Sequence, residues 1–456
     1  MQHHALAVLA LAVSVWPSAA QITMEQAVRG AAEKYPAVRA SLEEVAAAAA
    51  AINLARTSYL PRADFLGQVN RATHNNVFGM VLPQPLPVIP TVSGPVLRTN
   101  SLGNVWGTAL GAMVSWEPFD FGLRKATVEA SRSTRERAEA QVAVTRLQVS
   151  TAAADAFLTM LAAEQTLGAA RAAVARARVL DEVVSALAKS ELRPGAEASR
   201  AHAELAQAEI QVAQARQAVE VSRAALAQVL GLPAAQVAVV AGRLLEAPAP
   251  VGALGEHASA AHPVAVAQNK AVEQVKAREK VLDRSWYPRF NLAGALYARG
   301  TGVQPDGATG NAASGLGPNI QNWGVGLSVT FPALDLAGLR ARRQIEQHHE
   351  AAEQARYAQL LQDLDGQTAR ARAQLDGARR VAELAPVQLK AARDTESQAT
   401  ARYQAGLGGI VDVAEAQRLR TQAEIDNALA RLAVWRALLG LAAAQGDLAP
   451  FLDLAK

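Results

Sequence analysis

The stretch that decides the fold runs from Gly122 to Ser190 and reads GLRKATVEASRSTRERAEAQVAVTRLQVSTAAADAFLTMLAAEQTLGAARAAVARARVLDEVVSALAKS. It contains no proline and only one internal glycine, Gly168, and its alanines, arginines and glutamates are strong helix formers. Apolar residues recur at steps of 7, 4 and 3, the spacing of a coiled-coil face: Leu147, Ala154, Leu158 and Leu161. The stretch predicts one continuous helix on the order of 100 Å long, which needs other helices packed along it.

Two shorter helical segments flank this long helix in the sequence. Residues 24–59 are rich in alanine, and residues 197–230 carry apolar or small residues at alternating steps of 3 and 4. That alternation is a heptad seam, and its members are Leu205, Ala208, Val212, Ala215, Val219, Ser222, Leu226 and Val229. Together the two segments are about as long as the central helix at the same rise per residue, so stacked end to end they would line it.

The composition argues against large globular cores and against nucleic-acid binding. Aromatic residues make up only 4% of the chain, and the apolar half is dominated by alanine, which suits thin seams between helices. The net charge is +4, and acidic and basic residues are interspersed without a basic block. No stretch after the N-terminus reaches about eighteen uncharged apolar residues, so no transmembrane helix is predicted.

The N-terminus predicts an exported protein. Residues 1–20 resemble a signal peptide, with an apolar run from Ala5 to Val15 and the small residues Ser18-Ala19-Ala20 before an expected cleavage at Gln21. The sequence contains no cysteine. We therefore expect neither a disulfide nor a lipid anchor on an N-terminal cysteine.

Strand patterns lie between the helical segments. Residues 63–71 and 105–116 form one predicted hairpin, and residues 290–299 and 322–331 form another. The large apolar residues fall on one face of these strands: Trp106, Leu110, Val114 and Trp116, then Trp323, Val325, Leu327, Val329 and Phe331. Small or polar residues opposite them, over about ten residues, are typical of a membrane barrel strand, although a half-buried soluble hairpin gives the same pattern. Four strands cannot close a barrel, so a membrane-spanning chain has to oligomerise.

The whole arrangement occurs twice. The prolines of Tyr35-Pro36 and Leu60-Pro61-Arg62 are 25 residues apart, as are those of His262-Pro263 and Tyr287-Pro288-Arg289. Gly195 lies nine residues before Glu204, as Gly406 does before Glu415, and Leu230-Gly231-Leu232 is similar to Leu439-Gly440-Leu441. We predict a first repeat at residues 21–232, which consists of helix 24–59, hairpin 62–118, long helix 122–190 and helix 197–230. A linker, 233–256, leads to a second repeat at residues 257–444, which consists of helix 257–286, hairpin 289–331, long helix 338–404 and helix 410–444. A tail, 445–456, follows.

With these features the sequence resembles the TolC family of outer membrane efflux proteins over essentially all of the mature chain. The motifs that carry the resemblance, besides the repeat, are the Leu60-Pro61-Arg62 and Tyr287-Pro288-Arg289 starts of the hairpins, the turn from Asp120 to Arg124, and Tyr403 to Leu407 followed by Ile410 to Val413. The resemblance implies a mainly α fold with a β-barrel part. It also implies a homotrimer whose four strands per chain form a twelve-stranded outer membrane barrel above a periplasmic coiled-coil tunnel. Such a tunnel docks on a periplasmic adaptor and an inner-membrane pump, and its equatorial region would be residues 233–254 and the tail.

The resemblance also suggests roles for residues at the turns between the paired helices. Asp412 matches an aspartate that lines the narrow entrance, and Glu415 keeps a second carboxylate on the same helix face, so a trimer would carry rings of negative charge that favour cations. Acids near a helix N-terminus also simply complement the helix dipole. Tyr403 matches a tyrosine that helps to hold the gate shut. The arginine of that network is replaced by Gly408, and its aspartate by Ala201.

The same turns are where the family meets its adaptor. The resemblance implies contacts through Gly195 on the first turn and through Gly406 and Leu407 on the second. The first turn, Arg193-Pro194-Gly195-Ala196, lacks the leucine. Pro386 lies inside the second long helix, where it predicts a kink.

The sequence offers no sign of an enzyme. The eight histidines form no ligand pattern, and no nucleophile motif or phosphate loop is present, so we expect no cofactor or metal. The leading hypothesis is a passive outer membrane channel for drugs, small molecules or proteins in a tripartite efflux or type I secretion system. The alternative is a soluble, adaptor-like periplasmic coiled-coil protein. A third hypothesis, an exporter specialised for metal ions, has no support in the histidine or methionine pattern.

Overall fold

The computed structural model describes residues 20–73, 103–246, 258–304, 306–331 and 335–456. The expected signal peptide except Ala20, most of the proline-rich loop of the first hairpin and part of the linker lie outside the described residues. The chain divides into two compact units. We call residues 1–45, 138–269 and 355–456 the helical unit, and residues 46–137 and 270–354 the sheet unit.

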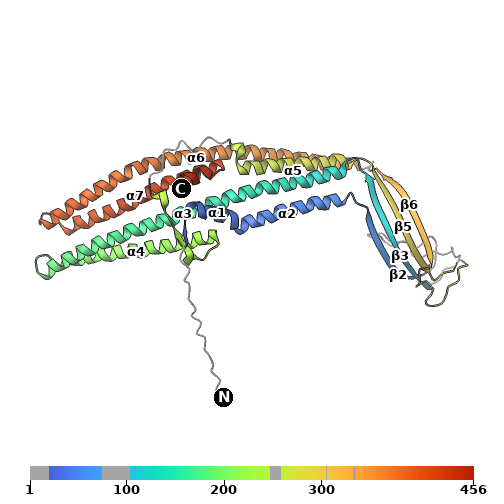
Figure 1. Cartoon of the computed structure of the whole chain (residues 1–456), viewed down its shortest axis with the longest axis horizontal. Coiled ribbons are helices and arrows are strands. Elements are labelled where there is room, and N and C mark those ends of the chain that lie inside the picture. Colours follow the sequence, from blue (N-terminus) through green and yellow to red (C-terminus); the bar gives the residue numbers. More distant parts are fainter. Residues whose placement is uncertain (1–19, 74–102, 247–257, 305, 332–334) are drawn as a thin grey trace, which may run out of the picture. The chain divides into compact units, whose positions relative to one another are not determined.

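The helices are arranged as two hairpins with shorter helices beside them (Figure 1). α3 (Leu123–Lys189) turns into α4 (Gly195–Leu230), and α6 (Leu336–Gln404) turns into α7 (Ile410–Gln445). The other α-helices of the described residues are α1 (Met24–Lys34), α2 (Pro36–Thr57), α5 (Pro263–Ser285) and α8 (Ala449–Ala455). α3 has 67 residues and α6 has 69, while α4 and α7 have 36 each.

The core of the helical unit lies where α3, α7 and α8 meet. Phe157 and Leu158 of α3 pack there with Trp435 of α7 and Phe451 of α8, and all four are at most 2% exposed. The predicted coiled-coil face of α3 is confirmed, because Ala154, Leu158 and Leu161 are buried in this core and Leu147 packs against it. Beside the core, β1 (Ala20–Ile22) pairs in parallel with β4 (Val237–Val239). The described residues around β4 and before α5 also form short 3-10 turns, at Ala234–Gln236, Gly242–Leu245 and Ser259–Ala261.

Proline positions correct two of the predicted helices. The expected helix 24–59 is two helices, because Tyr35 is extended (ψ 134°) before Pro36, which begins α2. The expected helix 257–286 begins only at Pro263, and the preceding His262 is extended in the same way (ψ 135°). A residue before proline is pushed out of the helical region, whereas proline itself suits a helix start because its missing N–H has no partner there anyway. Tyr35-Pro36 and His262-Pro263 are thus the same junction in the two repeats.

The second long helix continues through its proline. α6 is helical on both sides of Pro386, although the missing N–H removes one backbone hydrogen bond from the ladder. Among the described helices, α7 alone is long and apolar enough to cross a membrane. Because Trp435, Leu438 and Leu439 of α7 lie in the core, we assign its apolar character to packing between helices.

The sheet unit contains one four-stranded antiparallel sheet (Figure 1). Its strands are β2 (Arg62–Thr73), β3 (Asn104–Phe119), β5 (Arg289–Thr301) and β6 (Ile320–Thr330), in the order β2-β3-β5-β6. The pairing of β3 with β5 joins the two predicted hairpins into one sheet. β2 and β6 are its edges, so within the described part of the chain each has one side without a partner strand.

The register places the exposed large apolar side chains on one face of this sheet. Val114 lies opposite Gly294, for example, and Gly294 lies opposite Val325 on the next strand. This apolar face consists of Phe65, Val69, Leu110, Val114, Trp116, Leu292, Leu296, Trp323, Val325, Leu327 and Val329. Phe331 is exposed just beyond β6, and Trp106 is partly covered by the guanidinium of Arg71, 5.2 Å from its ring. Because successive residues of a strand point to opposite sides, the small and polar residues of β6 lie on the other face.

Candidate functional site

The two turns between the paired helices have the same backbone design. In the α3–α4 turn, Glu191 has the left-handed conformation (φ 57°), and the amide of Leu192 bonds back to the helix. In the α6–α7 turn, Gly406 has that conformation (φ 73°), and the amide of Leu407 bonds back in the same way. Both are Schellman endings, in which two amides beyond the helix satisfy two of its last carbonyls. Each turn then presents an exposed leucine, Leu192 at 71% and Leu407 at 72%.

This design corrects the matching of the two turns that the sequence spacing suggested. Glu191 and Leu192 correspond to Gly406 and Leu407, so the first turn does carry the leucine, whereas Gly195 is the first residue of α4. At the C-terminal ends of α4 and α7, Gly231 and Gly446 each cap the helix in the left-handed conformation. Gly446 rather than Gly440 therefore corresponds to Gly231. Comparing the positions of glycines in the two repeats does not reveal this match, because the residue that takes the left-handed conformation in the first turn is Glu191 and not a glycine.

A clamp joins the two turns, and Tyr403 is at its centre. The Tyr403 hydroxyl donates a hydrogen bond of 2.9 Å to Glu197 near the start of α4. The guanidinium of Arg193 lies 4.7 Å from the Tyr403 ring centroid and donates 3.1 Å to the Tyr403 carbonyl. Burial, followed by the hydrogen bond to Glu197, raises the pKa of Tyr403 above its ordinary value. Tyr403 itself is 4% exposed, whereas the side chains of Arg193 and Glu197 are 24% and 20% exposed, so the tyrosine is shielded while its partners are in contact with water.

The two positions that depart from the family's gate network lie beside this clamp. Ala201 is 1% exposed and packs with Tyr403, Val184, Ile410 and Val413 in a small apolar cluster. A Cβ on Gly408 would lie 3.5 Å from its nearest neighbours, which is ordinary contact, so this position is open to a side chain. Sequence comparison alone missed Arg193 and Glu197, although their spacing of four residues on a helix start is a signal for an ion pair.

Asp412 and Glu415 are both exposed at the start of α7, where the structure brings neither to Tyr403. Asp412 accepts a hydrogen bond of 3.2 Å from the amide of Gly409, the residue that caps α7. Asp412 therefore does stabilise the helix start, as an acid near a helix N-terminus is expected to do. Glu415 lies 3.5 Å from Arg418 and is 73% exposed.

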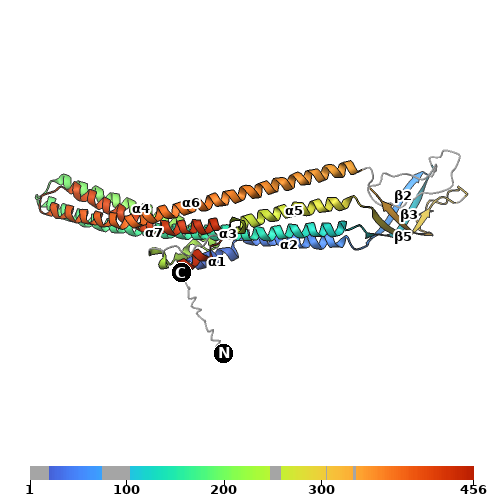
Figure 2. The ribbon, with the colours of Figure 1, turned by 90° about the horizontal axis from the view of Figure 1, so that it is seen from above.

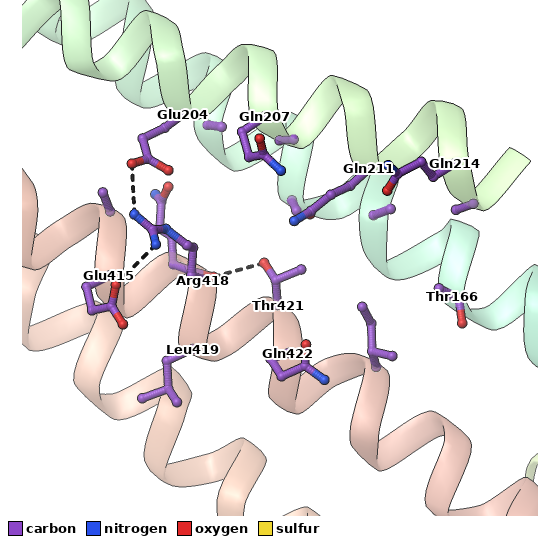
Figure 3. Close-up of a pocket in the computed structure, with 18 of the residues that line it drawn as sticks. Thr166, Glu204, Gln207, Gln211, Gln214, Glu415, Arg418, Leu419, Thr421 and Gln422 are labelled. Carbon is purple, nitrogen blue, oxygen red and sulfur yellow. Dashed lines mark hydrogen bonds and ion pairs between the residues drawn. The ribbon is translucent and has the colours of Figure 1, made fainter.

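Arg418 connects Glu415 to the first helix pair. Its guanidinium lies 3.0 Å from Glu204 of α4, at the mouth of a groove of about 640 Å³ between α4 and α7 (Figure 3). The hydrogen bond to Glu204 raises the pKa of Arg418 further above its already high value, so this cation stays charged. Glutamines line the sides of the groove and alanines of α3 lie beneath: Gln207, Gln211, Gln214, Gln417, Gln422, Ala170, Ala173 and Ala177.

Elsewhere in the helical unit, a largely buried ionic cluster connects α3, α6 and α7, with side chains between 10% and 28% exposed. Arg176 of α3 contacts Glu424 of α7 at 3.0 Å, and Arg420 contacts the same glutamate at 2.9 Å. Arg420 also pairs with Glu396 of α6. The cluster is electrically balanced, and removing one member would leave a buried charge unpaired, which is costly. None of these residues was expected from the sequence.

No metal centre is indicated in the described residues, which contain no group of three histidine, aspartate or glutamate side chains that could hold an ion. The features of the helix turns are instead ion pairs, a shielded tyrosine and exposed leucines. Such an arrangement can fix the distance between two helix pairs and can present a contact surface.

Comparisons with known proteins agree with the fold. The chain matches the profile of the outer membrane efflux protein family over residues 27–232 and 255–447. Among solved structures, the outer-membrane channel OprN is similar with a TM-score of 0.71 and 20% identity, covering 93% of this chain and 89% of that one. The CmeC outer membrane channel of Campylobacter jejuni has a TM-score of 0.70 and 16% identity, covering 93% and 85%. The outer membrane protein VceC of Vibrio cholerae has the same TM-score and identity, covering 93% and 96%.

A search of curated proteins returned no match. The structural similarities, all at low identity, concern the fold alone, whereas the profile match covers most of the sequence in both repeats. The chain belongs to the outer membrane efflux protein family.

Proposed function

We propose that the chain forms a trimeric channel through the outer membrane that serves a tripartite efflux or type I secretion system. The observation that supports this proposal best is the sheet, which has one exposed apolar face and, within the described residues, two edges without a partner strand. In lipid, an edge strand without a partner leaves backbone groups unsatisfied, so such a sheet has to close on itself. β2 and β6 have 12 and 11 residues and run in opposite directions, so β6 of one copy would extend the antiparallel order with β2 of the next.

The number of copies and the partners follow from the family resemblance. Three copies would give twelve strands, and the helices would form a periplasmic tunnel that meets an adaptor and an inner-membrane pump. The channel itself would be a passive conduit for drugs, small molecules or proteins, because nothing in the described residues suggests a site for energy conversion. We propose export by a cleaved signal peptide.

The helix turns would form the periplasmic end of this tunnel. We propose that the Tyr403 clamp holds the end closed, and that Asp412 and Glu415 form rings of negative charge there. Leu192 and Leu407, together with Gly406 and Gly195, would form the surface that meets the adaptor. The exposure of both leucines supports this assignment, because large apolar side chains at the tips of a helix pair are free to be buried by a partner.

The test of the channel is electron microscopy of the mature protein after extraction, with the mass measured on the same sample. A channel requires detergent for extraction and gives hollow particles with threefold symmetry and the mass of three chains. A monomer that is soluble without detergent would contradict the channel and favour the adaptor-like alternative.

The charge rings have their own test in planar lipid bilayers. Combining Asp412→Asn with Glu415→Gln should lower the preference for cations over anions, since both carboxylates would be lost at each copy. The control combines Glu182→Gln with Glu383→Gln, which removes the same charge from exposed positions on α3 and α6. An equal loss of selectivity in the control would contradict the ring assignment.

A further inference from the structure

The sheet unit contains a groove where the helices meet the strands. It has a volume of about 820 Å³ and lies between the start of α3 and the end of α5. Figure 1 and Figure 2 both show these two helices side by side. β3 directly precedes α3 in the sequence, α5 directly precedes β5, and these two strands are neighbours in the sheet. One chain therefore forms the groove by itself.

The aromatic end of the groove adjoins the apolar face, because the ring of Phe121 lies 6.3 Å from that of Phe290. Phe290 pairs with Val329, which places it on that face, and its other partner in the register is Phe119. The ring of Phe121 lies 4.6 Å from Phe119 and stacks on Tyr287 at 5.4 Å. Phe121 and Tyr287 line one end of the groove. The aromatic side chains thus continue from the apolar face directly into the groove.

Basic residues line the groove beyond these aromatic rings. Lys276, Lys280 and Arg284 recur at every fourth residue, so they lie along one side of α5, and Lys125 of α3 lines the groove with them. Lys276 has a carboxylate partner, Glu350, at 3.6 Å. Within the described residues, Lys125, Lys280 and Arg284 make no ion pair with an acidic side chain.

The acidic residues in the groove do not neutralise these three cations, because each is held by another base. The pairs, with their distances, are Glu129 with Arg132 at 2.8 Å, Glu273 with Lys270 at 2.7 Å, and Asp283 with Arg343 at 3.3 Å. Three exposed positive charges are therefore available to an anion. Their place next to an aromatic cluster and an apolar face restricts what that anion is.

We propose that this groove binds the headgroup of an anionic phospholipid whose acyl chains lie against the apolar face. The inference rests on the proposed insertion of the sheet into a membrane. Along the chain surface, apolar side chains are followed by aromatic ones and then by basic ones. A protein that faces a membrane is expected to have this order from the lipid interior to the headgroups. The lysines and Arg284 would contact the phosphate, while the rings of Phe121 and Tyr287 lie at the level of the glycerol.

Native mass spectrometry of the detergent-extracted protein tests the proposal. Phosphatidylglycerol should bind in preference to phosphatidylethanolamine, with up to one lipid per chain retained. Combining Lys125→Gln, Lys280→Gln and Arg284→Gln should weaken phosphatidylglycerol binding about a hundredfold, since each cation near a membrane surface contributes roughly a fivefold effect. The control combines Lys189→Gln, Lys390→Gln and Arg393→Gln, which removes the same charge from exposed helix positions of the helical unit.

Two results would overturn the lipid assignment while leaving the channel intact. One is a detergent-extracted trimer in which the groove variant binds phosphatidylglycerol as tightly as the control does. The other is full displacement of the lipid by inorganic phosphate at equal concentration, which would indicate a simple anion site. A chain that is soluble without detergent would instead contradict both the channel and this inference.

Discussion

Replacing Tyr403 with phenylalanine tests the clamp most directly. Tyr403→Phe keeps the ring beneath Arg193, 4.7 Å from its guanidinium, and keeps the apolar contacts with Ala201. It removes only the hydroxyl that donates 2.9 Å to Glu197. The variant thus separates the contact between the two helix pairs from the packing of the turn.

The expected size of the effect follows from the surroundings of this bond. A hydrogen bond to a charged group contributes about 1.5–3 kcal/mol to the state that contains it. Because the Glu197 side chain is 20% exposed, water competes for it, and we take the lower value. About 1.5 kcal/mol is a roughly tenfold change in the balance between clamped and unclamped turns for one chain. If three chains open together, the change approaches about a thousandfold.

Single-channel recording in planar lipid bilayers measures this balance as the open probability. Tyr403→Phe should raise it, and Tyr357→Phe, on the same helix but without a hydrogen bond from its hydroxyl among the described residues, should not. The two proteins should also have the same thermal stability within about 2 kcal/mol per chain. An open probability for Tyr403→Phe equal to that of Tyr357→Phe would refute the clamp.

The pH dependence gives a second check on the same variant. Burial and the bond to Glu197 raise the pKa of Tyr403, so the hydroxyl remains protonated in the clamped state. Its contribution is therefore fully present below the ordinary tyrosine pKa of about 10 and is lost only as pH rises through the raised value. The ratio of open probabilities between variant and wild type should stay constant from about pH 6 to about pH 9.

Three further predictions concern the turn, the sheet and a buried histidine. Gly406→Ala should destabilise the helical unit by about 1 kcal/mol in thermal unfolding because residue 406 has a positive φ, whereas Gly408→Ala should have a smaller effect. Val325→Arg, on the apolar face, should prevent insertion into the membrane by costing about 2–4 kcal/mol, whereas Ser328→Arg, on the opposite face, should insert normally in a fractionation assay. Burial lowers the pKa of His262, so protonation of this side chain opposes the folded state. The stability measured by thermal unfolding should therefore fall as the pH drops below about 6.5. His262→Gln should make stability less dependent on pH in this range.

The sequence predicted the parts of the fold that depend on local chemistry. The absence of proline from the stretch that forms α3 was enough to predict a long helix, and the spacing of Leu158 and Leu161 gave its buried face. The alternation in β6 gave the face that carries Val325 and Leu327. These features follow from the periods of a helix and a strand, which do not depend on distant residues.

The features that the sequence did not reveal depend on contacts between distant segments. The pairing of β3 with β5 joins strands that are separated in the sequence by α3, α4, the linker and α5, and no spacing in the sequence specifies it. The matching of the two turns was obscured because Glu191 takes a conformation that glycine usually takes, so the first turn had no glycine to mark the position that corresponds to Gly406. The start of α5 was misplaced because the apolar pattern before Pro263 does not show that His262 is extended.

The clamp illustrates why single positions are a poor guide to a network. According to the resemblance, the gate of the family contains a tyrosine, an arginine and an aspartate. In this sequence Gly408 replaces the arginine and Ala201 replaces the aspartate, so two of the three residues appeared to be lost. The structure nevertheless places a guanidinium and a carboxylate on Tyr403, from Arg193 and from Glu197, one helical turn before Ala201. Both now come from the first helix pair, so the phenol contacts a cation and an anion of the same chain. Because Tyr403, Arg193 and Glu197 contact one another within one chain, the clamp needs no second copy to form. Its strength should therefore be measurable in a detergent-separated monomer as well as in the assembled protein.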